Sequence, residues 1–123
     1  MDVRETEIRA RLNDITGPEP HEAERALITR LIASYLAKTP PGVDRLGELL
    51  RGGDPGAVRE HAHSLKGSSS NLGADHLAGI FADVEQTART GVLPDPDVTL
   101  GRLGAEQALT LTVLERVAAD YSA

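Results

Sequence analysis

Hydrophobic residues recur along this chain at the three- and four-residue spacing of amphipathic helices, and glycines and prolines separate one such stretch from the next. The stretches are rich in Ala, Leu, Arg and Glu, which are good helix formers. No run of β-branched residues alternates with polar ones, so no sheet is expected. The pattern predicts six helices, over residues 3–13, 20–37, 43–50, 55–72, 75–90 and 97–121.

Four of the six predicted helices are long and strongly amphipathic, and the loops that join them are short. Antiparallel packing is the simplest way to bury the apolar faces of such helices. We therefore predict an all-α fold, an antiparallel four-helix bundle with additional short N-terminal helices. Residues 1–16 are predicted to form an N-terminal helical extension, and residues 17–123 the bundle domain. The double proline at 40–41 is predicted to separate the second helix from the third.

The hydrophobic spacing also predicts which helix faces are buried. In the helix over 55–72, the residues expected on the core side are Val58, Ala62, Leu65, Ser69 and Leu72. In the helix over 20–37, the residues expected near the centre of the core face are Ala23, Leu27, Leu31, Ser34 and Ala37. The residues expected to widen that face are Ile28, Ile32 and Tyr35.

A chain of 123 residues with 40% hydrophobic and 26% charged residues is large enough for one globular domain with its own core. Its net charge of −6 argues against binding to nucleic acid, which requires a concentrated basic surface. The absence of cysteine from the sequence excludes disulfides, thiolate metal sites and cysteine nucleophiles. No apolar run approaches the roughly 20 residues of a membrane span, and the charged N-terminus is unlike a secretory signal. We therefore expect a cytoplasmic protein that does not bind membranes.

The stretch that carries candidate chemistry lies in the predicted helix over 55–72. On a helical wheel, His63, Lys66, Gly67 and Ser70 form one stripe that faces away from the expected core side. A glycine in the middle of a helix costs about 1 kcal/mol relative to alanine, and three successive serines add to that cost. We infer that Gly67 leaves space for a large partner to approach His63 closely.

An exposed imidazole has an ordinary pKa of about 6.5, so much of it is neutral at pH 7 and offers a free lone pair. Such a ring attacks a phosphoryl group without the help of a general base. Lys66 is expected to offset the charge of that group, and the serine hydroxyls to donate hydrogen bonds to it. The sequence contains neither a Walker A loop nor a kinase-type glycine-rich loop, so a partner protein is expected to supply the rest of the active site.

The segment HSLKGSSSNLGA at residues 63–74 resembles the signature of histidine-containing phosphotransfer (HPt) domains, in which His-x-x-Lys-Gly is followed by small residues. The likeness continues along the next helix as far as Ala88-Arg89. The resemblance implies a four-helix bundle that carries a phosphoryl group on Nε2 of one histidine and exchanges it with an aspartate of a receiver domain. It implies His63 as the phosphoacceptor, with Lys66, Gly67 and Ser70 as further site residues.

The resemblance also implies the partners of the chain. Receiver domains of response regulators are expected to exchange the phosphoryl group with it in a two-component phosphorelay, and a hybrid sensor histidine kinase stays open as a further partner. The receiver supplies the magnesium ion. We therefore expect this chain to bind no cofactor or metal, and to be a phosphoryl carrier without kinase or ATPase activity of its own.

Two alternatives stay open at this point. One is direct phosphorylation of His63 by the ATP-binding domain of a histidine kinase, as in chemotaxis kinases. The other is a non-catalytic helical adaptor that binds receivers and carries no phosphate. The remaining histidines do not suggest a metal site: His61 is expected to be a half-buried packing residue that points away from His63, and His21 and His76 lie near helix starts without ligand spacing.

Overall fold

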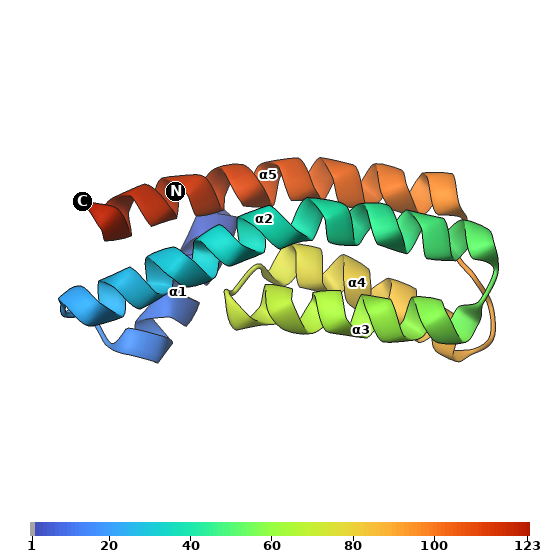
Figure 1. Cartoon of the computed structure of the whole chain (residues 1–123), viewed down its shortest axis with the longest axis horizontal. Helices are drawn as coiled ribbons and strands as arrows, with labels where there is room; N and C mark the ends of the chain where they lie inside the picture. The colour runs from blue at the N-terminus through green and yellow to red at the C-terminus, as the bar shows by residue number, and fades with distance from the viewer. Residues whose placement is uncertain (1) are drawn as a thin grey trace.

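The computed structural model describes residues 2–123, and every regular element in this range is an α-helix (Figure 1). The five helices are α1 (Val3–Thr16), α2 (Glu22–Gly52), α3 (Pro55–Asn71), α4 (Asp75–Arg89) and α5 (Pro96–Ser122). The predicted all-α fold is therefore confirmed. Met1, the first residue of the predicted extension, lies outside the described residues. None of the described helices combines the length and the apolar character needed to cross a bilayer.

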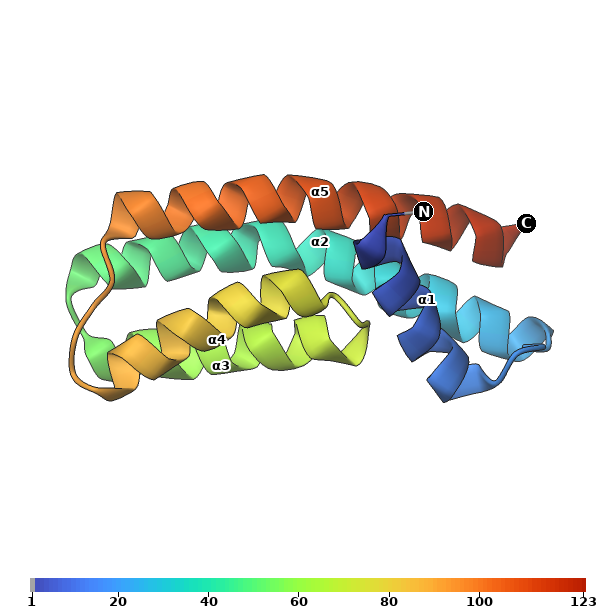
Figure 2. The same cartoon turned by 180° about the vertical axis from the view of Figure 1, so that it is seen from behind.

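Helices α2 to α5 form an antiparallel bundle in which each helix packs against two others. As Figure 1 shows, α2 and α5 lie side by side, and α3 and α4 form a second pair beneath them. Helix α2 also contacts α3, and α4 also contacts α5, so the four helices close around one core. The long α2–α5 pair extends beyond the turn between α3 and α4, and α1 lies across that end (Figure 2).

The predicted break at the double proline is wrong. Helix α2 continues through Pro40 and Pro41, so the predicted second and third helices are one helix of 31 residues. A proline inside a helix removes a backbone hydrogen bond and crowds the preceding turn. Here Thr39 before the prolines and Val43 after them are both buried on the same face. Packing on both sides of the prolines thus holds the helix together across them.

The prediction of which residues lie at the centre of the core face of α2 is also wrong. Leu27 and Leu31 are 41% and 40% exposed, whereas Ile28 and Ile32 are fully buried. The other residues that the spacing predicts at the centre of that face, Ala23, Ser34 and Ala37, are exposed as well. The reason is the continuity of α2: the buried positions repeat at helical spacing past the prolines, as Ile28, Ile32, Tyr35, Thr39, Val43, Leu46 and Leu50. This long stripe orients the whole helix.

Helix α1 crosses the end of the bundle and packs against α5 and α4 (Figure 2). Its Ile8 and Leu12 are fully buried and belong to the same hydrophobic core as the bundle helices. Gly73, in the turn between α3 and α4, makes this approach possible. It has a φ of 75°, and a Cβ there would lie 2.8 Å from the carbonyl oxygen of Glu7 and 3.0 Å from Cα of Ile8.

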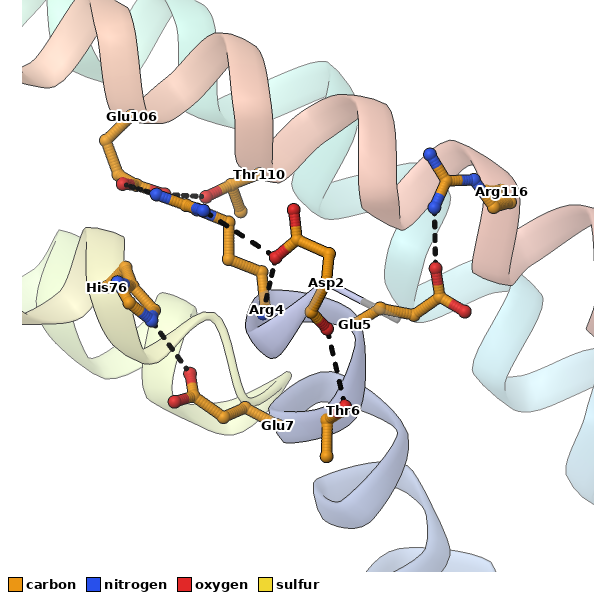
Figure 3. A network of polar contacts seen from close by, with 9 residues as sticks. All are labelled: Asp2, Arg4, Glu5, Thr6, Glu7, His76, Glu106, Thr110 and Arg116. Carbon is orange, nitrogen blue, oxygen red and sulfur yellow. Dashed lines mark hydrogen bonds and ion pairs between the residues drawn. The ribbon is translucent and has the colours of Figure 1, made fainter.

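Ion pairs also join α1 to α5, and a further polar contact joins α1 to α4 (Figure 3). Arg4 donates to both carboxylate oxygens of Glu106, at 2.5 and 2.7 Å, and Arg116 donates to Glu5 at 2.6 Å. On the α4 side, Nε2 of His76 lies 3.5 Å from Glu7. The pKa values of Glu5 and Glu106 lie below their ordinary value because of their arginine partners, Arg116 and Arg4 respectively. Both carboxylates are therefore ionised at neutral pH.

Neighbouring substitutions in α2 test the corrected core face. We expect Ile32→Ala to lower the free energy of unfolding by about 2–5 kcal/mol, because it leaves a cavity in the core. Leu31→Ala removes the same number of carbon atoms from a side chain that water already reaches. It should cost no more than about 1 kcal/mol. Urea denaturation of both variants measures the difference, and equal losses would contradict the orientation of α2.

Candidate functional site

The turn before α3 and the buried face of that helix fix its position. Asp54 caps the helix by accepting hydrogen bonds from the backbone N–H groups of Gly56 and Ala57, and Pro55 occupies the first turn, as predicted. The predicted core residues of this helix are all buried: Val58, Ala62, Leu65, Ser69 and Leu72. The hydroxyl groups of Ser69 and Tyr35 lie 2.6 Å apart inside the bundle. This packing sets the rotation of α3 about its axis.

The opposite side of α3 carries the His63 stripe, which consists of His63, Lys66, Gly67 and Ser70. The side chain of His63 is 67% exposed, Gly67 and Ser70 are exposed, and the Lys66 side chain is 34% exposed. The structure therefore brings the four predicted residues together on one accessible face. Lys66 is less exposed than the other three, and its ammonium group contacts Glu85 of the neighbouring helix α4.

Glu85 of α4 is the residue that organises this face. Its side chain is only 5% exposed, and its Oε2 atom lies 2.8 Å from Nδ1 of His63. The Nζ atom of Lys66 lies 2.6 Å from Oε1 of the same carboxylate. Arg89, one turn further along α4, donates from Nη2 to Oε2 at 3.0 Å. One buried carboxylate thus joins the imidazole of His63 to two cationic side chains.

The Glu85 carboxylate is ionised at neutral pH. The Lys66 ammonium lowers the pKa of Glu85 from an ordinary value of 4.5 to about 2, the hydrogen bond with His63 acts in the same direction, and burial opposes both. An ionised carboxylate only accepts hydrogen bonds, so Nδ1 of the neutral imidazole carries the proton that it donates to Glu85. The lone pair of the ring is then on Nε2.

Gly67 is required neither by the backbone nor by packing within the chain. A Cβ at this position would meet no atom within 4 Å, and its φ is not in the left-handed region. This contrasts with Gly73, where α1 fills the space. The open side of Gly67 agrees with the inference that the glycine leaves room for something outside the chain.

The other histidines lie in structural positions. His61 is half-buried, as predicted, and its Nε2 lies 2.8 Å from the carbonyl oxygen of Gly42. His21 caps α2 in a reciprocal arrangement with Glu24, and His76 faces Glu7 of α1. Within residues 2–123, no group of three or more His, Cys, Asp or Glu side chains lies close enough to hold a metal ion.

Sequence reasoning did not identify Glu85 and Arg89 as parts of the site. A signal was present: Glu85 follows Phe81 by four residues, so it occupies an apolar position of the α4 stripe. A charged residue at such a position is rarely buried without a partner. The partners could not be read from the spacing alone, because two of them lie on α3.

A cleft of about 540 Å³ opens on the other flank of α3, between α3, α2 and the end of α1. Ile15 of α1 and Leu31 of α2 line it and are 39% and 40% exposed. From α3, Ser64 and Ser68 line the same cleft. These serines follow His63 and Gly67 directly in the sequence, so the cleft lies on the face of α3 next to the His63 stripe.

Comparison with known families agrees with this geometry. The family model described as the Hpt domain matches residues 30–119, which include most of α2 and all of α3 and α4. The chain therefore belongs to the Hpt domain family. Membership implies histidine phosphotransfer in two-component signalling, a process in which Hpt domains interact with receiver domains. No curated protein and no solved structure matches the chain significantly.

The low pKa of Glu85 predicts a pH dependence of stability. A carboxylate whose pKa falls on folding contributes stability above its ordinary pKa and loses it as the pH falls through the folded value. For Glu85 this window runs from about pH 4.5 down to about 2. We therefore expect the difference in unfolding free energy between the wild type and Glu85→Gln to shrink across this range. Denaturant titrations at several pH values measure it, and a constant difference would contradict the ionised cluster.

Proposed function

We propose that this protein is a phosphoryl carrier of a phosphorelay, and that Nε2 of His63 is the atom that carries the phosphoryl group. The observation that supports this most directly is the exposed imidazole whose Nδ1 is occupied by a buried carboxylate. The reaction exchanges one bond for another. The Nε2 lone pair forms a bond to phosphorus, the bond from phosphorus to the aspartate oxygen of the receiver breaks, and the aspartate leaves as a carboxylate.

Glu85 assists this step from the far side of the ring. When Nε2 bonds to phosphorus while Nδ1 keeps its proton, positive charge develops on the imidazole. The Glu85 carboxylate, 2.8 Å from Nδ1, stabilises that charge and holds the ring in one orientation. No general base is needed, because no proton leaves the nucleophile. The reverse transfer, from His63 to a receiver, uses the same contacts.

The remaining residues of the His63 stripe act on the phosphoryl group and on the partner. The Lys66 ammonium, one turn along α3, offsets the charge of the phosphoryl oxygens. The Ser70 hydroxyl, one turn further, donates a hydrogen bond to the same group or to the partner. Gly67 leaves open the space that the partner needs. Magnesium belongs to the receiver in this proposal, and the chain binds no cofactor.

The receiver covers the His63 stripe and extends over the small side chains of α3 towards the adjoining cleft. Ile15 and Leu31 offer exposed apolar surface there, and Arg11 and Lys38 offer positive charge. A partner that approaches His63 closely therefore buries apolar area beside it, which contributes to docking. The cytoplasm, where response regulators are found, is the proposed location of the protein.

Phosphotransfer from a receiver tests the proposal. The full chain is incubated with a ³²P-labelled receiver domain and magnesium, and the label on the chain is measured over time. We expect label on the wild type and on His61→Gln, the matched control two residues away, and none on His63→Gln. The proposed carrier function would be refuted if no receiver domain encoded in the same genome transferred label to the wild type. Equal labelling of the wild type and His63→Gln would also refute it. Receiver binding without any transfer would favour the adaptor instead.

Gly67→Gln tests the need for open space. The substitution should slow transfer at least about tenfold, which corresponds to about 1.4 kcal/mol of lost docking or positioning. The free energy of unfolding should stay equal or rise, because glutamine favours helices more than glycine does. Gly104→Gln is the matched control, since this glycine of α5 also has nothing within 4 Å of a Cβ. Transfer to Gly67→Gln at the wild-type rate would contradict the role of the glycine.

A further inference from the structure

The charges around His63 do not balance. Glu85 contributes one negative charge, and Lys66 and Arg89 contribute two positive charges at 2.6 and 3.0 Å from its oxygens. With a neutral His63, the four side chains carry a net charge of about +1. The carboxylate would be satisfied by one cation and the imidazole alone, so the second cation calls for an explanation.

A buried carboxylate beside an imidazole poses a chemical difficulty for a nucleophile. Its negative charge favours the protonated ring, and an imidazolium has a proton on both nitrogens and no lone pair. The carboxylate that assists the attack by the neutral ring therefore also favours the protonated ring, which cannot attack. A site that keeps both the hydrogen bond and the lone pair benefits from cations that offset part of the carboxylate charge without contacting the imidazole.

Arg89 is positioned to do this. It donates to Oε2, the same oxygen that accepts from Nδ1 of His63, while Lys66 occupies Oε1. A guanidinium keeps its positive charge at every pH at which proteins are folded. Because Arg89 reaches Oε2 from its own helix, one turn beyond Glu85, it leaves the exposed side of the ring free.

Other charged groups lie on α3 and on the helices that pack against α3 and α4. On α3, Arg59 and Glu60 lie about one turn before His63, are exposed, and carry opposite charges. Lys38 of α2 lines the cleft on the other flank of α3. Arg102 of α5 pairs with Asp83 of α4 at 3.4 Å. Among residues 2–123, the Glu85 carboxylate is the charged group in hydrogen-bond contact with the His63 ring.

We propose that Arg89 is a positioning residue that, together with Lys66, offsets part of the charge of Glu85 and thereby favours the neutral, nucleophilic form of His63. This inference rests on the proposed function, since it assigns Arg89 a part in the acceptance of the phosphoryl group. Arg89 does not touch the reacting atoms. It acts through Glu85 on the proton that Nε2 must lack before the bond to phosphorus forms.

The first test does not depend on phosphotransfer. ¹³C-labelled histidine reports the titration of each imidazole by NMR, and the His63 signal is assigned by its loss in His63→Gln. We expect the midpoint of the His63 titration to move to higher pH in Arg89→Gln and to stay in place in Arg89→Lys, which keeps the charge. Arg102→Gln is the matched control, because Arg102 and Arg89 have side chains that are 54% and 55% exposed and each pairs with an acidic residue of α4. An unchanged midpoint in Arg89→Gln would overturn the inference.

The second test follows the rate of phosphoryl acceptance from a receiver against pH. Arg89→Gln should accept the group about threefold more slowly near pH 6.5, as expected for the loss of one nearby charge in a solvent-exposed site. At high pH it should reach the wild-type rate. A loss by the same factor at every pH would indicate a docking defect and would overturn the inference, while leaving the carrier intact. Failure of the wild type to accept the group at any pH would instead refute the proposed function, and the NMR titration would still decide the role of Arg89.

Discussion

The hydrogen bond between Nδ1 of His63 and the buried carboxylate of Glu85 is the contact on which the site depends. It determines which ring nitrogen keeps its proton. The same carboxylate also binds two cations, Lys66 through Oε1 and Arg89 through Oε2. The contact exists only because two helices pack in one register. Helix α3 must bury Leu65 for His63 to face outward, and α4 must bury Phe81 for Glu85 to reach the ring.

The features of the site that are local to one helix could be predicted from the sequence. Helical spacing alone separates Val58 and Leu65 from His63 and Gly67, and Asp54-Pro55 is a start signal that needs no tertiary contact. The partners of His63 could not be predicted in this way. Their approach depends on how α3 and α4 are rotated against each other, which is a property of the packed core and not of either segment.

The errors in α2 have the same origin. Pro40 and Pro41 are unfavourable in a helix when considered locally, but buried residues on both sides of them outweigh that cost. If the helix is taken to end at the prolines, the spacing within the shorter segment places Leu27 and Leu31 at the centre of the core face. The exposed Leu31 lines the cleft on the flank of α3 next to the His63 stripe, where the partner is proposed to dock. Helix α1, whose Ile8 and Leu12 lie in the common core, also borders that cleft.

The position of the phosphoryl group on the ring is the most direct test of this account. The chain is labelled with ¹⁵N-histidine and phosphorylated by a receiver, and phosphorus–nitrogen couplings are then measured by NMR. The account predicts one phosphorylated histidine, His63, with phosphorus bonded to Nε2 and a proton retained on Nδ1. Phosphorus on Nδ1, where Glu85 lies 2.8 Å away, or on another histidine would contradict it.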